Sequence, residues 1–158
     1  MVKVVIDEPC TNMPIILNYS GPKPDSVYFE MKNAVKRVFA IDDKDIEERE
    51  INWDRSSGEE KFSSTFLVTK ILDENTHLFV EIKINGSLKY SKEYGTEGKV
   101  SILIDPRIKS FANTSFISGI LGSRKYLEEK ISTYKSNCKD IVNLFVKDLK
   151  NFLNIKEL

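Results

Sequence analysis

Residues 62–84 have the sequence FSSTFLVTKILDENTHLFVEIKI, in which apolar side chains recur at every second position along two runs. The first run covers residues 62–69 and the second covers residues 76–84. Strict alternation is typical of antiparallel strands that bury one face and expose the other. Residues 73–75, between the runs, are Asp, Glu and Asn, which suit a short turn. This stretch therefore predicts two antiparallel strands joined by a turn.

The same alternation extends outward, from about residue 45 to residue 105. Upstream, it predicts a strand with three residues on each side: Arg49, Ile51 and Trp53 against Glu48, Glu50 and Asn52. Downstream, the series ends with Val100, Ile102 and Ile104. We expect an antiparallel sheet with one buried face and one solvent-exposed face, and we place His77, Glu81 and Lys83 on the exposed face.

Residues 124–153 contain neither glycine nor proline and predict one long amphipathic helix. Its apolar residues recur every three or four positions: Leu127, Ile131, Tyr134, Cys138, Ile141, Phe145, Leu149 and Phe152. Near the N-terminus, residues 2–6 predict a strand, and residues 15–19 predict either a second strand or its continuation. Residues 26–40 predict a shorter amphipathic helix. Residues 107–122, which follow Pro106, are expected to be irregular.

Composition restricts the classes of function. The chain has 158 residues, which suits a single domain over residues 1–158, and its 24 basic residues balance 24 acidic ones. A net charge of zero gives no case for a nucleic-acid partner. No apolar run reaches the length of a signal peptide or a transmembrane helix, so we expect a cytoplasmic protein without a membrane span.

Residues that commonly catalyse reactions or bind metals are few. His77 is the only histidine, and Cys10 and Cys138 lie far apart, so no metal site is expected. In a reducing compartment the two cysteines are expected to remain separate, buried thiols. The sequence contains no phosphate-binding loop, nucleophile elbow or zinc-protease motif, and we expect no cofactor.

The order of elements predicts an α+β fold in which a curved antiparallel sheet grips a long C-terminal α-helix, with a short helix near the N-terminus. This order resembles the helix-grip superfamily, which includes START lipid-binding domains, the birch-pollen-allergen group and polyketide cyclases. The resemblance covers most of the chain. It is carried by the run Phe62–Ile84 with its Lys70-Ile71-Leu72-Asp73 turn, by Gly86, and by Gly98–Ile104, which are similar to the paired central strands of polyketide-cyclase-like proteins. The chain departs from the superfamily in having one clear helix where two short ones usually follow the first strand.

The resemblance implies a cavity for a small hydrophobic or amphipathic ligand between the sheet and the C-terminal helix. Seven residues are candidates for its wall: Trp53, Phe62, Phe66, Tyr134, Cys138, Ile141 and Phe145. Four residues are candidates for a lid over its mouth: Phe111, Phe116, Ile117 and Ile120. Each of these is also the kind of residue that fills an ordinary core.

Two alternatives to ligand binding stay open. A polyketide cyclase- or dehydratase-like enzyme would bring polar side chains into the cavity, with Arg49, Tyr90, Tyr94 and Asp105 as candidates. A non-catalytic interaction domain would have a filled core and an exposed apolar patch. A homodimer stays open as well, because the long helix has further apolar positions at Val142, Leu144, Val146 and Leu153 that a second copy could cover.

Overall fold

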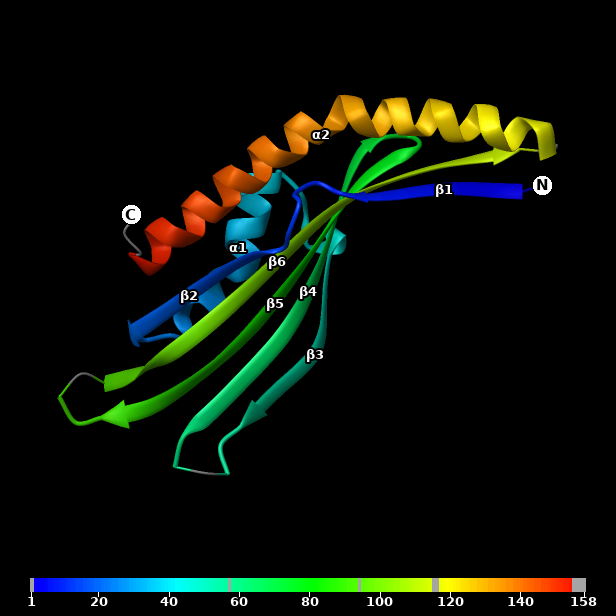
Figure 1. The fold of residues 1–158 in the computed structure, drawn as a ribbon. Coiled ribbons are helices and arrows are strands. Elements are labelled where there is room, and N and C mark those ends of the chain that lie inside the picture. Colours follow the sequence, from blue (N-terminus) through cyan, green and yellow to red (C-terminus); the bar gives the residue numbers. More distant parts are fainter. Residues whose placement is uncertain (1, 57, 94, 115–116, 155–158) are drawn as a thin grey trace.

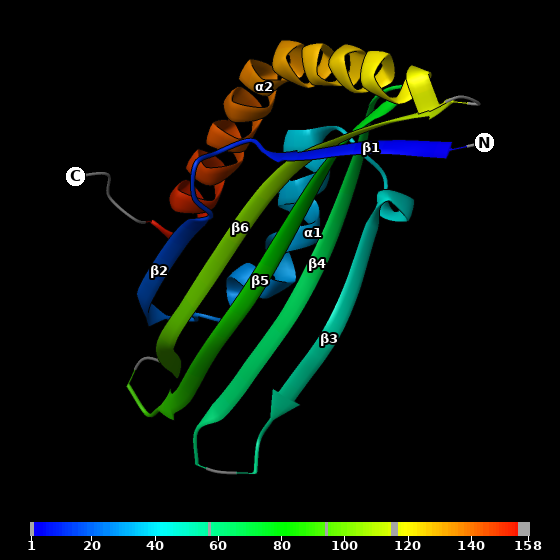
Figure 2. The ribbon, with the colours of Figure 1, turned by 45° about the vertical axis from the view of Figure 1, so that its right-hand side comes forward.

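One curved antiparallel sheet organises the fold, and both helices lie on the same side of it (Figures 1 and 2). The computed structural model describes residues 2–56, 58–93, 95–114 and 117–154. The strands are β1 (Val2–Pro9), β2 (Ile15–Pro22), β3 (Ile46–Asp54), β4 (Glu60–Asp73), β5 (Thr76–Ser91) and β6 (Gly95–Thr114). The helices are α1 (Ser26–Phe39) and α2 (Ile117–Leu153), with a short 3-10 turn at Asp43–Asp45. The predicted α+β class is confirmed, and the open sheet with its long C-terminal helix is consistent with a helix-grip-like fold.

β6 is long enough to pair with two strands along one edge. β2 pairs with residues 97–104 of β6, and β1 pairs with residues 107–114. The sheet order is therefore β1 and β2 together, then β6, β5, β4 and β3. Where β1 gives way to β2, the backbone N–H of Cys10 donates to the carbonyl of Pro106 at 2.9 Å. This corner directs the chain from β1 into β2.

Alternation along the strands separates a buried face from an exposed one. We call the face that the helices cover the inner face and the opposite one the outer face. Phe66, Ile82 and Ile104 are almost completely buried on the inner face. Thr65 and Lys83 are the sequence neighbours of Phe66 and Ile82, and they pair with each other on the outer face. The sequence-based prediction of two unlike faces is correct for β4, β5 and β6.

β3 departs from simple alternation. Its register against β4 shifts between Arg49 and Asn52, where Glu50 has a φ of 56°. Glu48 pairs with Phe66 and Trp53 pairs with Phe62, so Glu48 and Trp53 both lie on the inner face. One number is even and the other odd, so simple alternation would have put these two residues on opposite faces. The predicted grouping of Arg49 with Trp53 was therefore wrong, because a bulge inserts a residue and reverses the faces beyond it.

The long helix is confirmed, and it begins earlier than predicted. β6 continues to Thr114 and α2 starts at Ile117, so the irregular segment predicted over residues 107–122 was wrong. Pro106 is tolerated inside β6 because its missing N–H would point toward the corner between β1 and β2.

Three of the four further apolar positions of α2 also belong to the core: Val142 and Leu153 are buried, and Val146 packs against it, whereas Leu144 is exposed.

A disulfide joins Cys10 to Cys138, across 128 residues of sequence, and both cysteines are buried. It fastens the corner between β1 and β2 to the middle of α2. The prediction of two separate thiols was therefore wrong, because the fold brings their Cα atoms to 6.1 Å. Disulfides persist mainly in oxidising compartments, so this bond argues against the predicted cytoplasmic location. No helix within the described ranges has the length and apolar character needed to cross a membrane.

Candidate functional site

The seven predicted wall residues make their contacts in different parts of the interior. Trp53 stacks on Phe62 at a ring-centroid distance of 5.0 Å, and Phe145 packs against Phe39 at 5.2 Å. The Tyr134 hydroxyl donates to Asp73 at 2.9 Å, near the turn between β4 and β5. Phe66 is buried beside Tyr28, Ile141 packs at the edge of the core, and Cys138 forms the disulfide. The inner cavity stays a prediction, and its proposed walls pack as core residues.

Three of the four predicted lid residues belong to described elements of the fold. Phe111 is part of β6, opposite Val5, and its ring meets His77 edge-on at 5.1 Å. It therefore belongs to a regular strand on the outer face and not to an irregular lid. Ile117 and Ile120 lie in the first turns of α2, and Phe116 lies outside the described residues.

Of the polar residues considered for a catalytic cavity, those that the structure describes do not meet inside it. Arg49 pairs with Thr65, and Asp105 pairs with Glu81, which places both on the outer face. Tyr90 is 73% exposed, and Tyr94 lies outside the described residues. No group of three or more metal-ligating side chains occurs among the residues that the structure describes.

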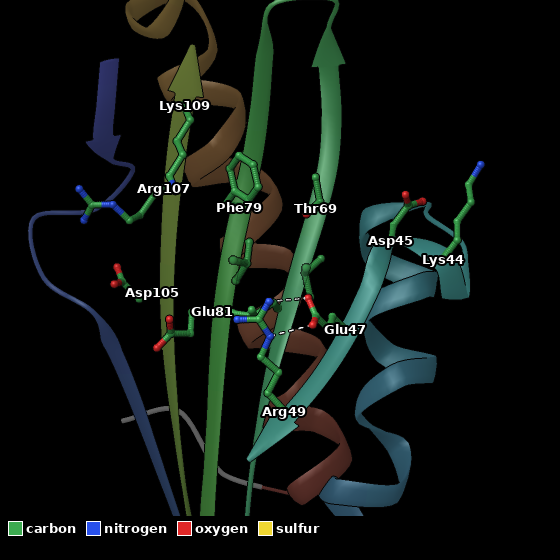
Figure 3. A pocket seen from close by; sticks show the side chains of 13 residues that line it. Lys44, Asp45, Glu47, Arg49, Thr69, Phe79, Glu81, Asp105, Arg107 and Lys109 are labelled. Carbon is green, nitrogen blue, oxygen red and sulfur yellow. Dashed lines mark hydrogen bonds and ion pairs between the residues drawn. The ribbon is translucent and has the colours of Figure 1, made fainter. Parts of the chain in front are cut away.

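A hollow of about 580 Å³ lies on the outer face, over β3, β4, β5 and β6 (Figure 3). We call it the open-face hollow. The helices lie behind the strands in this view, so the hollow is on the side of the sheet away from the core. Leu67 and Phe79 contribute half-buried apolar side chains to its lining. Eight charged residues also line it: Lys44, Asp45, Glu47, Arg49, Glu81, Asp105, Arg107 and Lys109.

Ion pairs hold much of this charged rim in place. Arg49 donates to both carboxylate oxygens of Glu47, at 2.8 and 2.9 Å, and this hydrogen bonding lowers the pKa of Glu47. Arg107 donates to Asp7 of β1 at 2.7 Å. The Lys109 ammonium group lies 4.8 Å from the centre of the Phe79 ring, a cation–π contact that partly covers the ring.

Two carboxylates face each other within the hollow. The register of β5 and β6 places Glu81 directly opposite Asp105, and like charges in this arrangement destabilise a sheet. Lys83 compensates in part, because its ammonium group lies 3.2 Å from Glu81. The hollow thus combines a small apolar floor with polar groups of both signs. Such a lining suits an amphipathic molecule better than a purely apolar one.

The sequence did not predict this site, because the candidate cavity was placed on the buried face of the sheet. The signal was present, since Leu67 and Phe79 are large apolar residues at positions that the alternation assigns to solvent. Charged residues gather around them only through the register of four strands, which a single sequence does not display. His77, by contrast, lies on the exposed face as predicted, near Phe79.

No family model and no curated protein matches this sequence. Among solved structures, a delta-endotoxin is similar over 75% of this chain, with 10% identity and a TM-score of 0.38, and the match spans 65% of that protein. A Staphylococcus aureus protein of unknown function is matched over 94% of this chain and 97% of its own, with 12% identity and a TM-score of 0.28. A Rhizobium loti protein is matched over 82% of this chain and 98% of its own, with 14% identity and a TM-score of 0.20. Similarities at this level assign the chain to no family.

Proposed function

We propose that this chain is a helix-grip-like binding protein for a small amphipathic molecule, and that the open-face hollow holds the ligand. The observation that carries the proposal is the volume of about 580 Å³ around Leu67 and Phe79, on a face that the sheet exposes to solvent. Sites for small molecules typically have volumes of about 300–1,000 Å³, with an apolar surface and a few polar groups that orient the ligand.

The contacts suggest how such a ligand is oriented. Its apolar part would lie against Leu67 and Phe79, where it displaces the Lys109 ammonium group from the ring. The displaced Lys109 and the neighbouring Arg107 would then meet an acidic group of the ligand. Glu81 and Asp105 would meet a basic group and reduce the repulsion between the two carboxylates.

Titration with the fluorescent probe 1-anilinonaphthalene-8-sulfonate tests the proposal. This dye has aromatic rings for Phe79 and an anionic group for Lys109, so we expect saturable binding with one dye per chain. Phe79→Ala should weaken binding about tenfold, which corresponds to about 1.4 kcal/mol. Phe111→Ala is the matched control, because it removes an aromatic ring from the same face but outside the lining of the hollow.

The outcomes separate the open-face hollow from other sites. Equal losses in the two variants, or no saturable binding to the unaltered protein, would contradict the proposal. Retained binding in Phe79→Ala would place the dye elsewhere and would likewise count against the hollow. Near-ultraviolet circular dichroism checks that both variants keep their packing, because loosened proteins bind this dye without a specific site.

A further inference from the structure

A row of uncharged polar side chains crosses five strands of the outer face. Strand pairing places Asn18 opposite Ser101, Ser101 opposite Asn85, Asn85 opposite Ser63, and Ser63 opposite Asn52. Asparagine and serine thus alternate across β2, β6, β5, β4 and β3. We call these five residues the Asn–Ser row. At about 4.8 Å between neighbouring strands, the row is about 19 Å long.

The strand preferences of the residues do not explain this row. Asparagine is depleted in strands, which favour β-branched and aromatic residues. Here Asn18, Asn52 and Asn85 all occupy ladder positions within strands, and all three are exposed. Positions where local preference and fold disagree are often functional.

Surface hollows border the Asn–Ser row, and its polar groups are available to bind a ligand. Asn85 borders three hollows of about 450, 550 and 230 Å³, which together reach every member of the row. Within the described ranges, the side chains of the row take part in no hydrogen bond or ion pair, either with one another or with other residues. Their donors and acceptors therefore point to solvent.

The chemistry of the row indicates what it can bind. Each amide and each hydroxyl group both donates and accepts hydrogen bonds, which complements the hydroxyl groups of a sugar. The strand spacing repeats these groups at a distance comparable to the length of one sugar ring. Lys61 and Lys99 lie two residues from Ser63 and Ser101, at the next outward-facing positions of β4 and β6, and their ammonium groups would bind a carboxylate on the sugar. Single-stranded nucleic acid fits less well, because no aromatic residue of the row offers a platform for its bases.

We propose that the Asn–Ser row is a binding site for an extended oligosaccharide that lies across the strands. The row shares no residue with the open-face hollow, so this proposal is independent of the function proposed above. Sugar hydroxyl groups would replace water at the amides and hydroxyls of successive strands. Asn85 lies at the middle of the row and is expected to make the largest contribution.

An array of neutral and uronate-containing oligosaccharides, with titration of any that bind, tests this proposal. We expect at least one class to bind, and Asn85→Val and Ser101→Val should each weaken binding about tenfold through the loss of one or two hydrogen bonds. Asn113→Val is the matched control, because Asn113 is an exposed asparagine of β6 on the same face, opposite Lys3. It should leave binding unchanged.

A stability measurement distinguishes a binding role from a structural one. If the row serves binding, Asn85→Val loses affinity while its melting temperature stays the same or rises, because valine suits a strand better. If the row shapes the sheet, the melting temperatures of Asn85→Val and Ser101→Val both fall. That result, the absence of any bound oligosaccharide, or preference for a single-stranded oligonucleotide would overturn the proposal.

Discussion

At the residue scale, Glu48 accepts two short hydrogen bonds on the inner face. Both the Tyr28 hydroxyl and the Ser64 hydroxyl donate to its Oε2 atom, each at 2.6 Å. Burial, then the hydrogen bond to Glu48 and its negative charge, raise the pKa of Tyr28 from 10.0 to about 12. Sequence alternation placed Glu48 on the opposite side from Trp53, so only the bulge in β3 makes this arrangement possible.

The raised pKa of Tyr28 predicts a loss of stability at high pH. Between about pH 10 and pH 12 the unfolded chain has lost the tyrosine proton while the folded protein keeps it, so the free energy of unfolding falls as the pH rises. Tyr28→Phe has no hydroxyl group to titrate and loses one hydrogen bond. The loss of that bond should lower the free energy of unfolding by about 1 kcal/mol at neutral pH. Urea unfolding of both proteins from pH 8 to 12 measures the difference. The difference between the two free energies of unfolding should be constant below pH 10 and shrink above it. If the two free energies instead ran parallel over the whole pH range, the raised pKa of Tyr28 would be refuted.

At the element scale, the disulfide connects the corner between β1 and β2 with α2. Reduction should lower the free energy of unfolding by about 4 kcal/mol, because closing a loop of more than 100 residues removes much of the entropy of the unfolded chain. Thermal unfolding with and without dithiothreitol measures this effect. The double variant Cys10→Ser, Cys138→Ser is the control, since dithiothreitol should no longer change its melting temperature. An unchanged melting temperature for the reduced native sequence would contradict the prediction.

The elements also show how far a sequence pattern reaches. Alternation and helical spacing predicted β4, β5 and most of α2, because each of these elements buries one face and exposes the other. The second half of β6 was missed because Pro106 suggests a break, and its partner β1 lies about 100 residues away in sequence. The first turns of α2 were missed because Gly119 and Gly122 lower helix propensity. Both corrections depend on tertiary contacts.

At the scale of the whole molecule, candidate sites were harder to predict than elements. The sequence identifies Phe62, Phe66 and Phe145 as buried, and they are buried. Burial alone does not distinguish a cavity wall from a filled core, since both use the same residues. The two surfaces that we propose for binding arise from strand register, which brings Asn18 beside Ser101 and Glu81 beside Asp105. A single sequence carries no direct signal for such cross-strand neighbours.

At this scale, the free energy of local unfolding should also differ from strand to strand. β5 and β6 are paired on both sides, and α2 packs against β6, whereas β3 is an edge strand with a bulge. Hydrogen exchange measured by mass spectrometry should therefore be slowest in β5 and β6 and fastest, among the strands, in β3. Equal protection of β3 and β5 would contradict this prediction.

Hydrogen exchange also distinguishes the two edges of the sheet, β1 and β2 at one and β3 at the other. Reduction of the disulfide should speed exchange in β1 and β2 much more than in β3, because only the first two meet at the corner that Cys10 holds against α2. A ligand in the open-face hollow should have the opposite effect. It would contact Glu47 and Arg49, so it should slow exchange in β3 and leave β2, which contributes nothing to the lining, nearly unchanged. If a bound ligand protected β2 and not β3, it would lie outside the open-face hollow.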